Sequence, residues 1–162
     1  MSSRVVNVVF AGLGGQGVIK ASDILADAAF RAGLEVKKAE VHGMSQRGGS
    51  VTSDVRFGAK VLSPMIPPGE ADYLVVLAPS EVQVTRGLLR PGGVLLPPEL
   101  IDEAKLPNSR SLNVALLGAL GRHLDLAEEH PPAAIRAALP ERLHDLNERA
   151  FRLGRDVALA TR

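Results

Sequence analysis

Apolar positions along the chain fall into short runs separated by glycine clusters and by segments with helical spacing. Residues 5–11 (VVNVVFA) are rich in β-branched side chains and stop at glycines, which predicts a buried strand. Residues 16–32 repeat apolar positions at helical spacing, and Gly33 is suited to end that helix. Residues 34–41 and 50–57 are the next predicted strands, and the second alternates apolar with polar positions as a half-exposed strand does.

The middle of the chain repeats the order of strand, helix and strand. Residues 73–78 (YLVVLA) predict a central strand. Ser80 is followed three residues later by Gln83, which matches a capping box and predicts a helix that runs to about Arg90. Residues 94–96 then predict a short strand.

The final third of the sequence is predicted to be helical. Residues 113–124 (NVALLGALGRHL) are almost wholly apolar, which indicates either a buried helix or a helix at an interface. Pro131 suits the first turn of a helix over residues 133–139. Residues 141–160 have the spacing of a long amphipathic helix.

This order of elements predicts a three-layer α/β/α fold built on a mainly parallel, Rossmann-like sheet. Residues 60–63 are a possible antiparallel arm, because Gly58 and Ala59 can turn the chain back. A length of 162 residues favours one domain over residues 1–162. A domain of that size buries roughly two-thirds of the surface that its unfolded chain exposes, so it needs no disulfide or structural metal for stability.

Composition excludes several classes of function. The net charge of +1 argues against a broad nucleic-acid footprint, and one Tyr with no Trp leaves no base-stacking platform. The apolar runs are far shorter than the ~20 residues that span a bilayer, so we expect a cytoplasmic protein without a membrane partner. The absence of cysteine excludes a disulfide framework, a thiolate zinc site and a cysteine-ligated iron–sulfur cluster in this chain.

The first glycine loop lies between a predicted strand and a predicted helix. Glycine lets backbone N–H groups approach an anion without a Cβ in the way, and a helix N-terminus adds partial positive charge. The loop is therefore a candidate phosphate site. The alternative is that its glycines only allow close packing of strand and helix. The candidate binding residues are Gly12, Gly14, Gly15, Gln16 and Gly17.

A stand-alone oxidoreductase that binds NAD or FAD is a competing interpretation of this loop. It needs an acidic residue about 20 positions further on to hold a ribose, and Glu40 is the candidate. The alternative for Glu40 is an ordinary solvated carboxylate. The chain also lacks the second mononucleotide-binding half of a full dehydrogenase.

The second glycine loop, HGMSQRGGS, does not belong to the dinucleotide fingerprint. Arg47 followed by Gly48 and Gly49 sets a guanidinium beside unobstructed backbone donors. That arrangement suits a phosphate, a carboxylate or the carbonyl groups of a partner. The alternative is an internal ion pair of Arg47 that fixes the loop.

The strings GLGGQGV, AEVHGMSQRGGSVTSDVRFG and ADYLVVLAPSE resemble the gamma subunit of the 2-oxoacid:ferredoxin oxidoreductases. The resemblance is strongest to the gamma-type beta subunit of indolepyruvate ferredoxin oxidoreductases. It continues through Asn113 with LLGAL to Asn147-x-x-Ala150-Phe151-x-x-Gly154, so it covers nearly the whole chain.

The resemblance implies a non-catalytic subunit of an enzyme that oxidatively decarboxylates a 2-oxoacid to an acyl-coenzyme A and reduces ferredoxin. It implies thiamine diphosphate in an alpha/beta-type partner subunit and iron–sulfur clusters in other modules. It implies no catalytic residue and no metal ligand in this chain, and a contribution of both glycine loops to holding coenzyme A. An obligate partner also predicts an exposed apolar face, for which residues 113–124 and 63–69 are the candidates.

Overall fold

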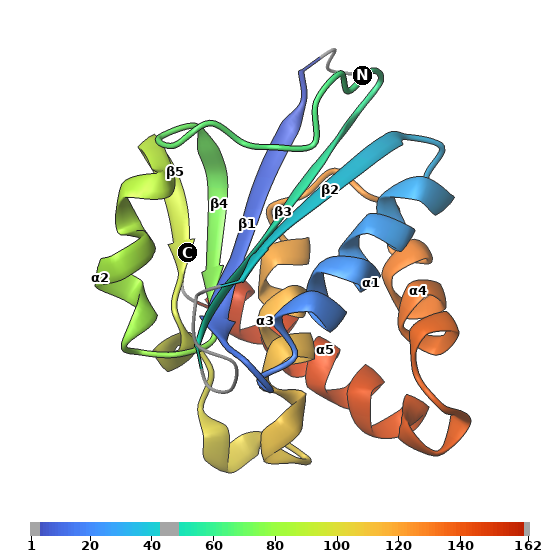
Figure 1. Cartoon of the computed structure of the whole chain (residues 1–162). Helices are drawn as coiled ribbons and strands as arrows, with labels where there is room; N and C mark the ends of the chain where they lie inside the picture. The colour runs from blue at the N-terminus through green and yellow to red at the C-terminus, as the bar shows by residue number, and fades with distance from the viewer. Residues whose placement is uncertain (1–3, 43–48, 161–162) are drawn as a thin grey trace.

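The computed structural model describes residues 4–42 and 49–160, and within them five strands form one sheet with the order β2-β3-β1-β4-β5 (Figure 1). The strands are β1 (Val6–Leu13), β2 (Glu35–His42), β3 (Ser50–Gly58), β4 (Ala71–Val76) and β5 (Leu89–Leu96).

The sheet is mixed. β1 pairs in parallel with β4, and β4 pairs in parallel with β5, whereas β3 is antiparallel to both β1 and β2. Within the described residues, β1, β2, β4 and β5 therefore run in the same direction and β3 runs opposite to them. Two of the four strand pairings are antiparallel, so the predicted mainly parallel sheet is supported in part. The predicted antiparallel arm was misplaced, because residues 60–63 are in no strand. β3 follows β2 closely enough to pair as a hairpin, and its other edge then receives β1.

Two helices, α1 and α3, pack on one face of the sheet, and α4 and α5 pack against them (Figure 1). The short helix α2 covers part of the opposite face, so the layers are unequal in thickness. The helices are α1 (Val18–Arg31), α2 (Glu81–Thr85), α3 (Leu112–Gly121), α4 (His130–Ala138) and α5 (His144–Ala160).

The alternation of side chains in β1 separates two cores. Val8 and Phe10 face the large core under α1 and α3. Val9 and Ala11 face a smaller core on the other side, which Ile66 helps to close. Both cores are apolar, so β1 is buried on both faces, as a central strand of an α/β sheet is.

The region of α2 differs from its prediction. The helix has five residues and ends in a 3₁₀ turn at Arg86–Leu88, and Ser80 makes no side-chain capping bond. β5 then begins at Leu89 and runs through Pro91. β5 lies at the sheet edge, where a proline need not donate to a neighbouring strand, and this explains how the proline fits in it.

Helix α3 is the central buried helix, since all residues from Asn113 to Leu120 are buried. It is therefore not an exposed partner-binding face. Two glycines let α3 and α5 approach backbone to backbone. A Cβ on Gly118 would lie 2.0 Å from the carbonyl oxygen of Phe151, and one on Gly154 would lie 1.7 Å from that of Ala115.

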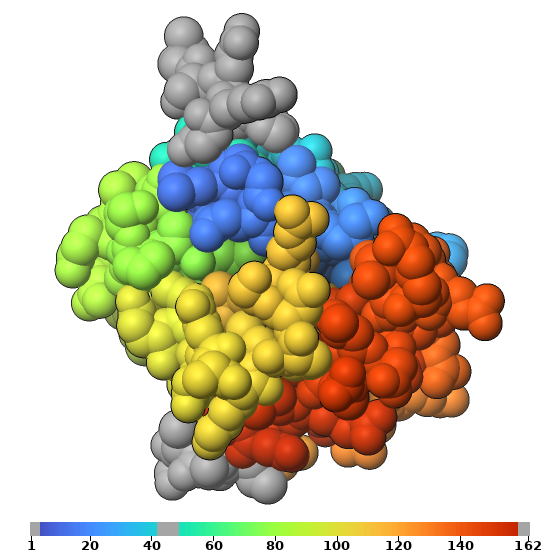
Figure 2. All heavy atoms as spheres, turned by 90° about the horizontal axis from the view of Figure 1, so that it is seen from below, coloured from blue at the N-terminus to red at the C-terminus, as the bar shows by residue number. Residues whose placement is uncertain are grey.

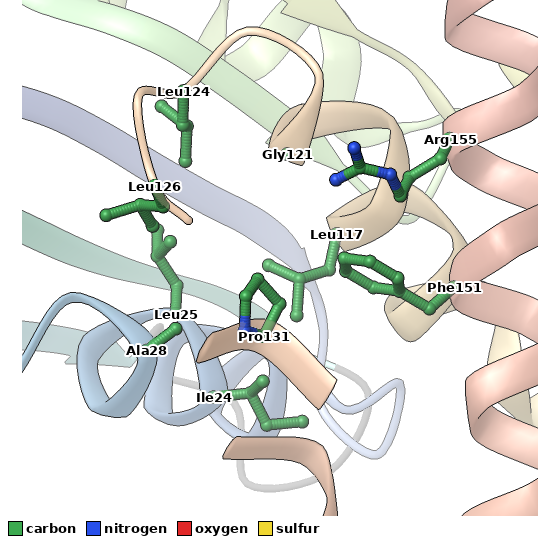
Figure 3. Close-up of a pocket in the computed structure, with 10 residues that line it drawn as sticks. All are labelled: Ile24, Leu25, Ala28, Leu117, Gly121, Leu124, Leu126, Pro131, Phe151 and Arg155. Carbon is green, nitrogen blue, oxygen red and sulfur yellow. The ribbon is translucent and has the colours of Figure 1, made fainter. Parts of the chain in front are cut away.

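The junction of α1, α3, α4 and α5 is almost completely filled. Ile24, Leu117, Pro131 and Phe151 converge there, and the space between them is about 10 Å³ (Figure 3). That volume holds one water molecule at most. The junction therefore belongs to the core and is not a ligand site. In the described part of the chain, no helix is long and apolar enough to cross a bilayer.

Candidate functional site

The first glycine loop connects β1 to α1 at the carboxyl edge of the sheet. The side chain of Gln16 folds back onto this loop. Its Oε1 accepts a hydrogen bond of 2.7 Å from the Leu13 N–H, and its Nε2 donates to the Leu77 carbonyl at 3.4 Å. Gln16 therefore braces the loop and ties it to the end of β4.

The glycines of this loop have different roles. A Cβ on Gly12 would lie 2.8 Å from Val18 Cγ2, and one on Gly17 would lie 2.5 Å from Asn113 Nδ2. Close packing therefore accounts for Gly12, and close packing together with a φ of 84° accounts for Gly17. Gly15 has a φ of 88° and nothing within 4 Å of its Cβ position, so it borders open space. Among the described residues, no backbone acceptor pairs with the N–H groups of Gly15 and Gly17.

The two glycine loops meet at one edge of the sheet. The Gly14 N–H donates a hydrogen bond of 2.9 Å to the Gly49 carbonyl, directly beyond the pairing of Leu13 with Ser50. This bond occupies the Gly14 donor, so Gly14 joins the loops. Arg47 and Gly48 lie outside the described residues.

A buried carboxylate stands next to the start of β3. Glu81 is 4 % exposed, and its Oε1 accepts a hydrogen bond from the Ser50 hydroxyl. Its Oε2 is buried and has no hydrogen-bond partner within residues 4–42 and 49–160. A buried charge with an unpaired oxygen is costly, which marks Glu81 as an acceptor for a further donor.

An open cavity of about 480 Å³ lies beside the first loop. Asn113 forms part of its wall, and its Nδ2 donates to the Gly17 carbonyl at 3.2 Å while its Oδ1 accepts from the Val114 N–H. Seen from below, the first glycine loop (blue in Figure 2) and the segment before α3 (yellow) lie on this face. The cavity is lined by Gly15, Gln16, Gly17, Leu77, Ser109, Arg110, Leu112 and Asn113, and no carboxylate is among them.

Sequence reasoning did not identify Arg110 or Asn113 as residues of the site. Asn113 carries a detectable signal, because it is a polar residue at the start of a wholly apolar helix. Arg110 carries none, because it lies in a connector without periodicity and reaches the loop only through the tertiary fold.

Known proteins are similar to this chain in sequence and in fold. The sequence model of the family described as "Pyruvate ferredoxin/flavodoxin oxidoreductase" matches residues 7–107. The chain belongs to this family. It is 35% identical to the "Indolepyruvate oxidoreductase subunit IorB" of Thermococcus kodakarensis, over 91% of this chain and 93% of that protein. It is 32% identical to the "Pyruvate/ketoisovalerate oxidoreductases common subunit gamma" of Pyrococcus furiosus, over 91% of this chain and 94% of that protein.

Solved structures agree with this assignment. The gamma subunit of a keto/oxoacid ferredoxin oxidoreductase from Geobacter sulfurreducens superposes with a TM-score of 0.79 at 26% identity, over 97% of this chain and 98% of that one. A 2-oxoglutarate:ferredoxin oxidoreductase from Magnetococcus marinus has the same fold in part, with a TM-score of 0.84 at 20% identity over 98% of this chain and 32% of that one. The resemblance to gamma-type subunits is thus confirmed, and the chain is a subunit of a 2-oxoacid:ferredoxin oxidoreductase.

The gamma-type sheet also bears on Glu40, the ribose ligand of the competing interpretation. β3 separates β2 from β1, so Glu40 is two strand spacings, about 10 Å, from the strand that carries the glycine loop. Its Oε2 accepts a hydrogen bond of 3.2 Å from Lys38 Nζ. Glu40 is therefore a surface carboxylate of the β2 edge, away from the cavity. Among the described residues, no three His, Asp or Glu side chains are grouped as metal ligands.

Proposed function

We propose that this chain is the non-catalytic, gamma-type subunit of a thiamine-diphosphate-dependent 2-oxoacid:ferredoxin oxidoreductase, and that its two glycine loops contribute to binding coenzyme A. The observation that carries the proposal is the hydrogen bond between Gly14 and Gly49. It joins the loops beside a cavity of about 480 Å³, large enough for part of a cofactor.

The chemistry of the cavity fits the phosphates of coenzyme A. Gly15 and Gly17 offer N–H groups that have no backbone acceptor among the described residues, and Arg110 adds a guanidinium. Arg47, Gly48 and Gly49 belong to the same proposed site from the second loop. In this assignment, Gly12, Gly14 and Gln16 shape the loop, and Gly15 and Gly17 face the ligand. Thiamine diphosphate and the iron–sulfur clusters belong to partner subunits, and ferredoxin accepts the electrons.

We further propose that the enzyme acts on indolepyruvate. The support is that relatives named as indolepyruvate oxidoreductase subunits match 91% to 97% of this chain at 33% to 35% identity. Comparing indolepyruvate, pyruvate and 2-oxoisovalerate as substrates of the assembled enzyme tests this assignment. Preference for pyruvate or 2-oxoisovalerate would refute it.

Replacing Arg47 tests the ligand role. Loss of one charged hydrogen bond to a phosphate costs roughly 1.5–3 kcal/mol, so Arg47→Ala should raise the apparent KM for coenzyme A of the assembled enzyme about 10- to 150-fold. The apparent KM for the 2-oxoacid should stay unchanged. Arg86→Ala removes an exposed arginine from the turn after α2 and is the control. An unchanged KM for coenzyme A in the Arg47 variant would exclude the ligand role.

A pure scaffold is the second candidate, and Glu81 favours it. The unpaired Oε2 of Glu81 is an acceptor available to an internal ion pair of the second loop. If Arg47 serves only that pair, Arg47→Ala and Glu81→Gln should both weaken assembly with the partner subunit. Both assembled variants would then keep the wild-type KM for coenzyme A.

The segment between β3 and β4 is proposed as a contact of the partner subunit. Met65, within the expected segment 63–69, is 58% exposed, and Leu62, directly before that segment, is 83% exposed. This segment crosses the upper end of the sheet, opposite the first glycine loop (Figure 1). A partner that contacts both ends of the sheet therefore has to extend along the domain from one end to the other.

A further inference from the structure

We infer that the coenzyme A site continues past Arg110 into a second groove, and that this groove takes the phosphorylated ribose of the nucleotide half. The inference rests on the proposed function and extends it to residues that neither glycine motif contains.

A second cavity, of about 350 Å³, adjoins the first. The two share Arg110 and Asn113 as wall residues, so a ligand can pass from one to the other without leaving the surface. The far wall comes from α5 and the turn before it, and Lys20 of α1 closes one side. The cavity is lined by Lys20, Asn108, Arg110, Ser111, Asn113, Val114, Leu139, Arg142, Leu143, Leu146 and Asn147.

The charge of this groove is one-sided. Lys20, Arg110 and Arg142 line it, and no carboxylate lines either cavity. Within the described ranges, none of these three cations forms an ion pair, whereas Arg90, Arg136 and Arg155 each pair with a carboxylate elsewhere.

Lys20 Nζ donates a hydrogen bond of 3.4 Å to the Ala138 carbonyl. The chain as a whole carries a net charge of +1, so three cations without carboxylates around one groove form a local positive field.

The groove also offers an acceptor and an apolar floor. Asn147 is 7% exposed, and its Nδ2 donates a hydrogen bond of 2.9 Å to the Leu143 carbonyl. That bond turns the amide NH₂ to the backbone and leaves the amide oxygen for a hydroxyl or an amino group. Leu139 and Leu146 supply apolar surface beside it. Cations, one acceptor and apolar contact together match a phosphorylated nucleoside better than a bare inorganic anion.

The order of groups in coenzyme A fits the order of the two cavities. Its diphosphate lies between the pantetheine arm and a ribose that carries a 3′-phosphate. The diphosphate is placed at the Gly15 turn and Arg110, where the cavities join. The 3′-phosphate then lies between Lys20 and Arg142.

The test compares coenzyme A with 3′-dephospho-coenzyme A as ligands of the assembled enzyme, by equilibrium dissociation constants. The wild-type enzyme should bind coenzyme A at least about tenfold more tightly. Arg142→Gln and Lys20→Gln should each reduce that preference, and the double variant should abolish it. Arg152→Gln is the control, because it removes an exposed arginine of α5, the helix after the turn that carries Arg142, and Arg152 lines neither cavity.

The outcomes separate the two proposals. If the double variant keeps the full wild-type preference for coenzyme A over 3′-dephospho-coenzyme A, the proposal of the second groove is refuted. The proposed function still stands in that case if Arg47→Ala weakens coenzyme A binding. If Arg47→Ala, Arg142→Gln and Lys20→Gln all leave coenzyme A binding unchanged, both proposals fail. Lys20 and Arg142 are exposed, so melting curves equal to wild type are expected for their variants.

Discussion

The contact between α3 and α5 predicts a large cost for one added methyl group, in Gly154→Ala. The new Cβ would lie 1.7 Å from the Ala115 carbonyl oxygen, 2.7 Å from its carbonyl carbon and 3.0 Å from the Ala119 nitrogen. All three atoms are backbone, so no side-chain rotation relieves the clash. The two helices have to move apart, and these helices hold Asn113 and Asn147 at the walls of the cavities.

The expected loss of stability follows from two opposing effects. Overpacking a close contact typically costs about 1–3 kcal/mol, and a backbone-to-backbone contact belongs at the upper end. Replacing glycine by alanine inside a helix returns about 1 kcal/mol. The net loss is therefore about 2 kcal/mol, which lowers the Tm of a domain of this size by about 4–8 °C.

Urea unfolding followed by far-ultraviolet circular dichroism measures this loss. Gly121→Ala is the control, since its Cβ would lie 3.5 Å from Arg155 Nη1 and 3.6 Å from Phe151 Cζ, which is ordinary contact. That variant should be as stable as wild type or slightly more stable. Equal stability of the Gly154 and Gly121 variants would refute the close helix packing.

Two further predictions test the loop and the sheet. Gly17 and Gly33 have φ values of 84° and 85°, so alanine at either position costs about 1–2 kcal/mol of stability. Of these two substitutions, Gly17→Ala also brings a Cβ against Asn113, whereas a Cβ at Gly33 has nothing within 4 Å. Gly17→Ala should therefore unfold at a clearly lower urea concentration than Gly33→Ala. Equal midpoints would contradict the contact. Burial raises the pKa of Asp54 above 3.8, so the folded state binds its proton more tightly than the unfolded state does. Wild type should therefore gain stability relative to Asp54→Asn as the pH falls through that raised pKa. Urea unfolding of both proteins between pH 3.5 and pH 7 measures this difference in stability. A difference that does not change with pH would contradict the prediction.

Local sequence patterns were enough to predict the first half of the site. The β-branched run, the glycines and the helical spacing after them each favour the same local structure, and the structure places α1 at Val18–Arg31, within the predicted residues 16–32. The resemblance implied that both glycine loops help to hold coenzyme A, which requires the two loops to lie close together. The structure shows this proximity through Gly14 and Gly49.

The remaining features depend on tertiary contacts that no local pattern records. The direction of β3 depends on which strands take its two edges, and alternation at period two is the same in either direction. The apolar composition of residues 113–124 is compatible with either a buried helix or a helix at a subunit interface. The structure shows a buried helix, because α5 packs against it through Gly154. Arg110 comes to the loop from about a hundred residues away in sequence.

The most direct test of the central claim is equilibrium binding of coenzyme A to the proposed thiamine-diphosphate-dependent partner subunit, with and without this chain. We expect that adding the wild-type chain tightens coenzyme A binding at least about tenfold, and that adding the Arg47→Ala chain tightens it less. Equally tight binding by the partner alone would show that this chain assembles the enzyme without contributing to the coenzyme A site.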